Sequence, residues 1–176
     1  SPEDVVKEYG TDALRYFLLR EISTFEDSPF TMERFKEAYN ANLANGLGNL
    51  VSRIMTMSAK HVSYKDYLGG ESEISERFHS FPGKEVSFYD TYELNKIMND
   101  IWDTISVLDV YIQKEEPFKK IKTDSEKAKK DIAYLRSHLL RVAWRLAPFM
   151  PETSKTIREA VEQNKNPQKP LFPRKD

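Results

Sequence analysis

The sequence predicts an all-α protein, built as an up-and-down bundle of helices. Apolar residues recur at spacings of three and four over long stretches, as they do on the buried face of an amphipathic helix. Proline, glycine and capping residues mark the ends of these stretches. No stretch shows the apolar–polar alternation of a half-buried strand, and no segment repeats. We therefore expect helices that pack on helices.

The N-terminal part is predicted to hold two short helices and a loop. Ser1 is the expected N-cap of the first helix, Pro2 its first residue and Gly10 its stop. Thr11 is expected to cap the second helix, "TDALRYFLLREIS". Its buried face is predicted to carry Ala13, Leu14, Phe17 and Leu18. The turn formers "TFEDSPF" follow as a loop.

A long helical pattern runs from residue 31 to residue 62. It is consistent either with two helices that meet near Tyr39 to Asn42 or with one bent helix. Residues 63–90 break the pattern with glycine, proline, serine and charges, which predicts an excursion over the surface. A strong helix follows over residues 90–113, with Leu94, Ile97, Ile101, Ile105 and Leu108 on its core face.

The remaining segments are predicted from proline positions. Pro117 interrupts the helical pattern because proline cannot continue the hydrogen-bond ladder. The next helix covers residues 123–147 and is stopped by "PFMP". The last helix covers residues 152–163. Residues 164–176 are an irregular tail, predicted to pack back on the domain.

Composition limits the possible functions. The 176 residues suffice for one domain with a sizeable core. The formal charge of -1 neither supports nor excludes an RNA partner, because a local basic patch matters more than the sum. The absence of cysteine excludes disulfides and thiolate metal sites. No signal peptide and no bilayer-spanning run occurs, so we expect a soluble, cytoplasmic protein without a membrane partner.

The sequence contains no recognisable catalytic motif. Its histidines, His61, His79 and His138, lie too far apart for a ligand-spacing motif. The G-x-G of "NGLGN" follows a helix rather than a strand, which argues against a phosphate loop. We therefore expect no catalytic residue, no metal ligand and no cofactor in this chain.

A polar stripe accompanies the core stripe of the long helical pattern. On a helical wheel, the core stripe carries Leu43, Leu47, Leu50, Ile54 and Met57. The polar stripe carries Asn42, Asn45, Asn49 and Arg53. Three amides and a guanidinium in a row suit the edges of unpaired bases, although an ordinary solvated face would look similar. On the same wheel, Gly46 is placed to admit a nucleotide and Gly48 to admit a neighbouring helix.

A second feature combines an aromatic ring with positive charges. Pro117 ends a helix and presents Phe118, which is followed by Lys119, Lys120 and Lys122. A ring beside several ammonium groups can stack one base and hold its phosphates. Alternatively, Phe118 packs under the helix end and the lysines face water.

Four blocks of the sequence resemble, in order, the C-terminal portion of bacterial methionyl-tRNA synthetases. They are "SPEDVVKEYGTDALRYFLLREIS", "YNANLANGLGNLVSR", "APFMPETSKTI" and "PLFPRKD". The resemblance covers nearly the whole chain and is patchy through residues 63–90. It implies a helical bundle of the class I aminoacyl-tRNA synthetase anticodon-binding type. It also implies three parts: the end of the stem-contact region over 1–28, the anticodon-binding bundle over 29–163, and the tail over 164–176.

The resemblance also implies a function. In the family, the catalytic domain precedes the first block and carries the KMSKS and HIGH-type motifs, which this chain lacks. The parent enzyme would join methionine to its tRNA, using ATP with Mg, and this piece alone should be inactive. Its partners would be the CAU anticodon loop of methionine tRNA and its own N-terminal catalytic domain.

By position, the family's anticodon-reading residues fall on Asn49 and Arg53. The family's stacking Pro-Trp pair falls on Pro117 and Phe118, so an indole is replaced by a phenyl ring. Asp109 stands where the family usually has Asn, and its charge needs a neighbouring Lys or Arg near phosphates. Two alternatives remain: the same domain of an isoleucyl, valyl, leucyl or cysteinyl enzyme, or a helical adaptor that binds a protein through the polar stripe.

Overall fold

The computed structural model describes residues 1–22, 30–63 and 93–175, and all regular structure in these ranges is helical, which confirms the all-α prediction. Most of the predicted loop at 24–30 and of the predicted excursion at 63–90 lies outside the described residues. The elements are α1 (Pro2–Tyr9), α2 (Thr11–Tyr16), η1 (Phe17–Glu21), α3 (Met32–Ala38), η2 (Tyr39–Gly48), α4 (Asn49–His61), α8 (Leu94–Glu115), α9 (Pro117–Lys120), α10 (Ser125–Leu146) and α11 (Pro151–Gln163). The two segments labelled η are π-helical.

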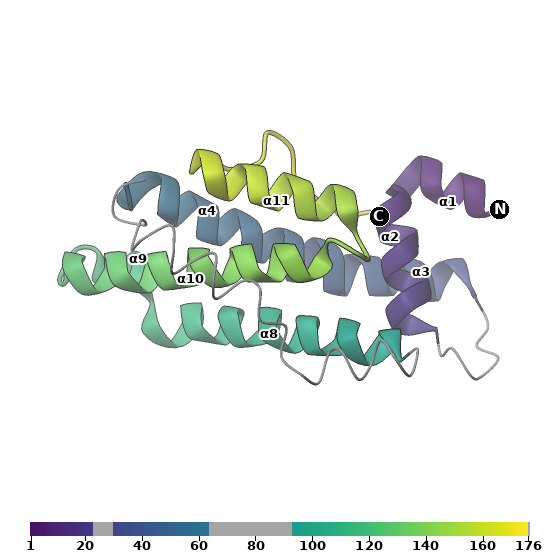
Figure 1. The fold of residues 1–176 in the computed structure, drawn as a ribbon, viewed down its shortest axis with the longest axis horizontal. Coiled ribbons are helices and arrows are strands. Elements are labelled where there is room, and N and C mark those ends of the chain that lie inside the picture. The colour runs from purple at the N-terminus through teal and green to yellow at the C-terminus, as the bar shows by residue number, and fades with distance from the viewer. Residues whose placement is uncertain (23–29, 64–92, 176) are drawn as a thin grey trace.

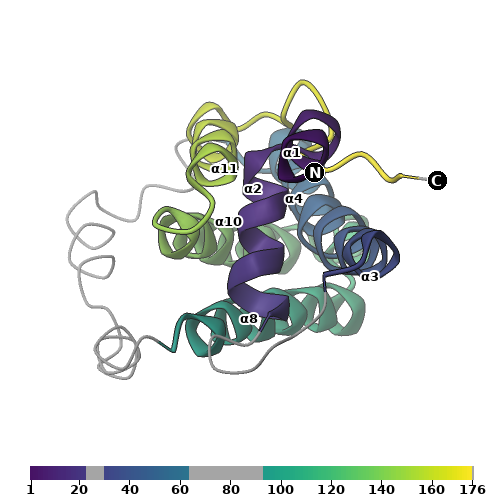
Figure 2. The same cartoon turned by 90° about the vertical axis from the view of Figure 1, so that its right-hand side faces the viewer.

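Four long helices form the bundle. Figure 1 shows α4, α8, α10 and α11 lying lengthwise beside one another, with α9 at one end and α1 and α2 at the other. From α8 to α11 the helices alternate in direction, and α4 runs in the same direction as α8. Viewed from the end, α2 crosses the bundle (Figure 2). None of the described helices has the length and apolarity needed to cross a membrane.

The core lies where the apolar stripes meet. Every residue of the predicted core stripe over 43–57 is buried, as are the predicted α8 residues Ile97, Ile101, Ile105 and Leu108. Leu94 is partly buried. Full burial of each such side chain contributes about 1.5–3 kcal/mol, so the facing stripes account for the bundle.

Capping explains where several helices begin. Ser1 and Asp4 form a capping box at the start of α1, as the Ser–Pro opening suggested. Gly10, at φ 89°, separates α1 from α2 in a conformation that favours glycine. The expectation that Thr11 caps α2 is wrong, because Thr11 is already helical and no side chain caps this end.

A buried carboxylate replaces the missing cap at another helix. The N-cap position of α11, Met150, offers no side-chain acceptor. Instead, Asp12 of α2 accepts a hydrogen bond of 2.7 Å from the backbone N–H of Thr153. This contact satisfies an otherwise orphaned donor in the first turn of α11 and ties the N-terminal helices to the bundle.

The pattern over residues 31–62 forms one continuous helix with a π-helical middle. The junction residues Tyr39 and Asn49 both keep right-handed helical angles, so no break separates α3, η2 and α4. The π segment replaces i→i+4 hydrogen bonds by i→i+5 bonds, which widens the turn. A similar π segment, η1, explains why Leu18 is 48% exposed although the sequence placed it on the buried face.

The residues after α11 cross back over the start of the long helix. The Tyr39 hydroxyl donates to the carbonyl of Pro173 at 3.0 Å, and Asn40 exchanges two hydrogen bonds with the backbone of Lys175. Phe172 is buried beside the Tyr39 ring. Nearer α11, Asn164 bonds to Ser58 and Val62 at the end of α4. These contacts fix the tail along α4 and η2.

Candidate nucleic-acid interface

Arg53 and Phe118 meet at one open groove of about 390 Å³, which we call the Phe118 groove. It is lined by Ser52, Arg53, Thr56 and Met57 of α4, Ile112 of α8 and Phe118 of α9. Glu116 turns the chain in a left-handed conformation, so that Pro117 starts α9 and is buried. Phe118 is 45% exposed, so part of its ring packs on the protein and part faces the groove.

The guanidinium of Arg53 forms an ion pair with Asp109 of α8. The second carboxylate oxygen of Asp109 accepts a hydrogen bond of 2.6 Å from the side-chain amide of Gln113. The negative charge of Asp109 is therefore compensated by Arg53. Both side chains are about a third exposed, at 33% and 37%, so the pair is expected to stabilise the fold by at most about 1 kcal/mol.

Asn42 and Asn45 do not lie beside Arg53. They line a second groove of about 280 Å³ between η2 and α8, which we call the Trp102 groove. Its walls include Asn42, Asn45 and Gly46 of η2 and Trp102, Asp109 and Val110 of α8. Asn45 and Asn42 precede Arg53 by eight and eleven residues, which is about 12 and 16 Å along a helix at 1.5 Å per residue. The predicted stripe is thus divided between two grooves.

Asn49 lies at the first position of α4, four residues before Arg53. Residues at this spacing are neighbours on a helix surface, at about 5–6 Å between Cβ atoms. The side chain is exposed. Asn49 is therefore a neighbour of Arg53 on the surface of α4, but it does not line the Phe118 groove.

The three predicted phosphate-binding lysines differ in their surroundings. Lys119 pairs with Glu116, and its ammonium lies 5.8 Å from the centre of the Phe118 ring. Lys120 pairs with Glu115, which lowers the pKa of that carboxyl and raises the pKa of the lysine. Lys122 is exposed and has no ion pair within the described part of the chain. Negative partners thus offset two of the three charges.

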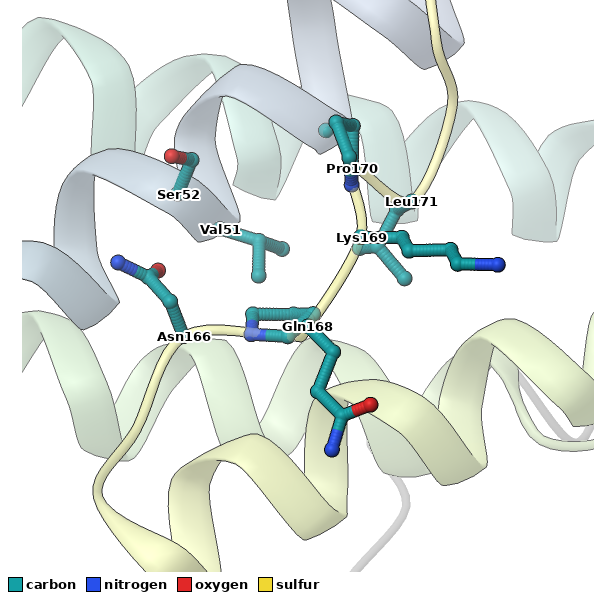
Figure 3. A pocket seen from close by; sticks show the side chains of 9 residues that line it. Val51, Ser52, Asn166, Gln168, Lys169, Pro170 and Leu171 are labelled. Atoms are coloured by element: carbon teal, nitrogen blue, oxygen red, sulfur yellow. The ribbon is translucent and has the colours of Figure 1, made fainter.

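A third groove lies between α4 and the tail. Figure 3 shows residues Asn166 to Leu171 passing beside Val51 and Ser52. The Asn166 amide donates to the hydroxyl of Thr56 at 2.7 Å, so the tail is bonded to a residue that also lines the Phe118 groove. A Cβ on Gly48 would lie 3.8 Å from the backbone nitrogen of Phe172. Gly48 therefore faces the tail and not a neighbouring helix.

The sequence analysis missed Trp102 and Ser106, which line the Trp102 groove, and Gln113, which bonds to Asp109. These residues share one side of α8 with Asp109, at successive spacings of four, three and four. A helical wheel of residues 94–115 would have grouped them, because such spacings mark one face. Trp102 is only 5% exposed, and its indole N–H has no hydrogen-bond partner among the described residues. Within those residues, no three His, Asp or Glu side chains are placed to hold a metal ion.

The helical bundle agrees with comparisons to known families. A model of class I tRNA synthetases, "tRNA synthetases class I (M)", matches residues 1–55 and defines the class. The model "Anticodon binding domain of methionyl tRNA ligase" matches residues 71–171, more than half of the chain. The chain therefore belongs to the family of methionyl-tRNA ligase anticodon-binding domains.

Relatives and solved structures agree with this assignment. The chain is 35% identical over 167 residues to the methionine–tRNA ligase of Lactococcus lactis, covering 91% of the chain and 25% of that protein. It is 30% identical over 174 residues to the enzyme of Thermotoga maritima, covering 96% of the chain and 28% of the relative. The chain thus spans about a quarter of the length of the curated relatives it matches.

The fold is also similar to that of a solved structure, the apo form of Mycobacterium tuberculosis methionyl-tRNA synthetase. The TM-score is 0.75 at 22% identity, over 100% of this chain and 41% of the other. At this identity, the likeness concerns the fold. It agrees with the predicted bundle of the class I anticodon-binding type.

Proposed function

We propose that this chain recognises the CAU anticodon loop of methionine tRNA. It would do so as part of a longer cytoplasmic enzyme, whose N-terminal domain joins methionine to the tRNA with ATP and Mg. The family assignment and the names of the relatives support this proposal. The structural observation that carries it is the Phe118 groove, where a guanidinium and an exposed aromatic ring line one open surface.

In the proposed complex, each side chain of the groove has a distinct task. Phe118 stacks on one unpaired base, a contact worth about 1–3 kcal/mol. Pro117, fixed at the start of α9, holds the ring at the groove. Arg53 donates to base edges. Its Nη1 bonds to Asp109, and the guanidinium carries five N–H donors in all. The side-chain amide of Asn49, one helical turn before Arg53, supplies one further donor group and one acceptor.

The lysines would hold the RNA backbone. Lys122 is the first candidate because it is exposed and has no ion pair among the described residues. Lys119 and Lys120 would exchange a glutamate for a phosphate on binding, so their net contribution is smaller. The Asn42 and Asn45 amides would contact the same loop from the separate Trp102 groove.

Binding of RNA hairpins tests the proposal directly. Hairpins with a CAU loop, and hairpins whose loops carry isoleucine, valine or cysteine anticodons, would be titrated at two salt concentrations. We expect tightest binding to CAU and affinity that falls with salt, because phosphate contacts release counterions. Preference for another loop would assign the domain to another class I enzyme. Absence of RNA binding at low salt would contradict the proposal and favour a protein-binding adaptor.

A further inference from the structure

The short helix α9 carries Phe118 but depends on its neighbours for its place. It has four residues, and an isolated helix of one turn is not stable in water. Pro117 is buried, and Glu116 forms the turn before it in a left-handed conformation. Phe118 and Lys120 are two residues apart, which separates them by about 200° around the helix axis. Lys120 therefore marks the back of α9, away from the side on which Phe118 meets the groove.

Two carboxylates from neighbouring helices lie beside the Lys120 ammonium. Its nitrogen is 2.5 Å from Oε2 of Glu115 on α8 and 4.0 Å from Oδ2 of Asp131 on α10. Asp131 is only 7% exposed, and its Oδ2 atom accepts no hydrogen bond within the described part of the chain. A buried carboxylate needs a compensating charge, because the charged group has lost its hydration. Asp131 therefore favours the position that Lys120 takes behind α9.

The other oxygen of Asp131 links it to α8. The hydroxyl of Tyr111 donates to Oδ1 at 2.8 Å. Burial, together with this hydrogen bond, raises the pKa of Tyr111 to about 12, so the hydroxyl keeps its proton and remains a donor. The Tyr111 ring also packs on Tyr134 of α10, with 5.0 Å between the ring centres. Asp131 thus joins α10 to α8 through Tyr111 and to α9 through Lys120.

We propose that Asp131 is a positioning residue for RNA binding, because it fixes the back of α9 and so keeps the Phe118 ring at the groove. This inference rests on the proposed function of the chain. The carboxylate is buried, so it contacts no base itself and acts through the ring that it places. A ring that is already in place loses less conformational freedom when a base stacks on it.

Two variants loosen this contact without touching the groove. Asp131→Asn removes the charge but keeps the shape of the side chain and an acceptor for the Tyr111 hydroxyl. Tyr111→Phe removes only that hydroxyl, and it carries the test should Asp131→Asn fail to fold. Glu162→Gln is the control, because it replaces a carboxylate by an amide at an exposed position of α11.

Hydrogen exchange tests the placement of α9 in the absence of RNA. The N–H of Ile121 donates to the carbonyl of Pro117 at 3.1 Å, and the N–H of Asp124 donates to the carbonyl of Lys120 at 2.7 Å. We expect both groups to exchange about threefold faster, or more, in the two variants, because this end of the bundle opens locally. The N–H of Ser154 in α11 should exchange at its former rate, which a general loss of stability would not allow.

The binding test is a double-mutant cycle with Phe118. At low salt, Asp131→Asn should weaken binding of the CAU hairpin by about three- to tenfold, the lower part of the range for residues coupled in one network. In the Phe118→Ala background the same change should cost less than about twofold, because the ring that it positions is gone. Tyr111→Phe should act in the same direction and depend on Phe118 in the same way. Glu162→Gln should bind as the unchanged protein does.

The possible results separate this inference from the proposed function. If Asp131→Asn and Tyr111→Phe bind the hairpin as tightly as the unchanged protein, or leave the exchange of α9 unchanged, the positioning role is overturned and the proposed function stands. An equal loss with and without the Phe118 ring also overturns it, because Asp131 then acts by another route, such as a phosphate contact of Lys120. Failure of every hairpin to bind at low salt overturns both proposals.

Discussion

Arg53 of α4 and Asp109 of α8 join two parallel helices through an ion pair, and Gln113 holds the carboxylate from its other side. A pair that is about one third exposed contributes little to stability. It does restrict the rotamers of a long and otherwise flexible side chain. The pair therefore positions the guanidinium at the Phe118 groove before any ligand arrives, which lowers the ordering cost of binding.

Replacement of Arg53 should separate binding from stability. Arg53→Ala should weaken CAU hairpin binding by about 10- to 100-fold, the range of a lost base-edge contact. Arg53→Lys should recover little of this loss, because an ammonium keeps the charge but not the planar fork. Fluorescence anisotropy measures the affinity, and urea denaturation should show a loss of less than about 1 kcal/mol. Arg141→Ala, at an exposed position of α10, is the control, and equal effects of both alanine variants would contradict a specific role.

Phe118 should respond to ring size. Phe118→Ala should weaken hairpin binding by about 1–3 kcal/mol, whereas Phe118→Trp should strengthen it because the indole offers a larger stacking face. The ring is 45% exposed, so neither change should alter the melting temperature by more than a few degrees. Anisotropy titrations provide the measurement. Unchanged affinity in Phe118→Ala would exclude stacking on this ring.

The two glycines of η2 should behave oppositely when replaced by alanine. Gly46→Ala should raise the free energy of unfolding by up to about 1 kcal/mol, because alanine is the better helix former and has room. Gly48→Ala should lower it by about 1–3 kcal/mol, since its Cβ would lie 3.0 Å from the Leu43 carbonyl oxygen and force a shift. Urea denaturation of both variants checks the order. Equal stabilities would refute this account of the π-helical crowding.

The stability should fall in mildly acidic solution because of His138. Burial lowers the pKa of His138, the Arg141 charge lowers it further, and the Tyr134 carbonyl only partly opposes this. The unfolded chain therefore binds the proton at a higher pH than the folded protein does. The stability that the neutral His138 contributes is therefore complete above the ordinary histidine pKa of about 6.5. It is lost as the pH falls below that value. His138→Gln should show a smaller drop in melting temperature between pH 7.5 and 5.5, and an unchanged drop would contradict the assignment.

Removal of the Asp12 cap should loosen the attachment of the N-terminal helices. Asp12→Ala should lower the free energy of unfolding by about 1–3 kcal/mol, because the Thr153 N–H loses a charged, buried acceptor. Asp12→Asn keeps an oxygen acceptor of the same shape and should cost less. Chemical denaturation gives the energies, and hydrogen exchange at Thr153 locates the change. Protection of Thr153 that is unchanged in Asp12→Ala would show that this contact is dispensable.

The sequence predicted the helices well because their ends carry local signals. Ser1 and Pro2 start α1 as predicted, for reasons confined to a few residues. Pro117 was predicted only to interrupt the helical pattern and begins the short helix α9, and Pro151 begins α11 one residue before the predicted start. The core faces of α4 and α8 were also correct, because burial follows apolar spacing. The π-helical hydrogen bonding of η2 was not predicted, since a change from i+4 to i+5 bonding leaves no apolar signature in so short a segment.

The site was predicted in part. The structure brings Arg53 and Phe118 to one groove and leaves Asn49 beside Arg53, whereas Asn42 and Asn45 lie in another. This division follows from their distance along the helix, because a helical wheel shows the side on which a residue lies and not its height. The ion-pair partners of the charged residues, such as Asp109 for Arg53 and Glu115 for Lys120, were not predicted. They depend on which helices pack together and on how far one helix is shifted along the other. The boundaries at residues 28 and 163 and the RNA contacts stay predictions.

The length of helix α8 sets the distance between the two ends of the bundle. Its 22 residues span about 33 Å at 1.5 Å per residue. Figure 1 shows α9, with the Phe118 groove, at one end of this span and the helices α1 and α2 at the other. Because the helices between them pack on one another, the fold keeps these two ends apart by about the length of α8. In the proposed complex, an RNA that contacted both ends would therefore have to span that length.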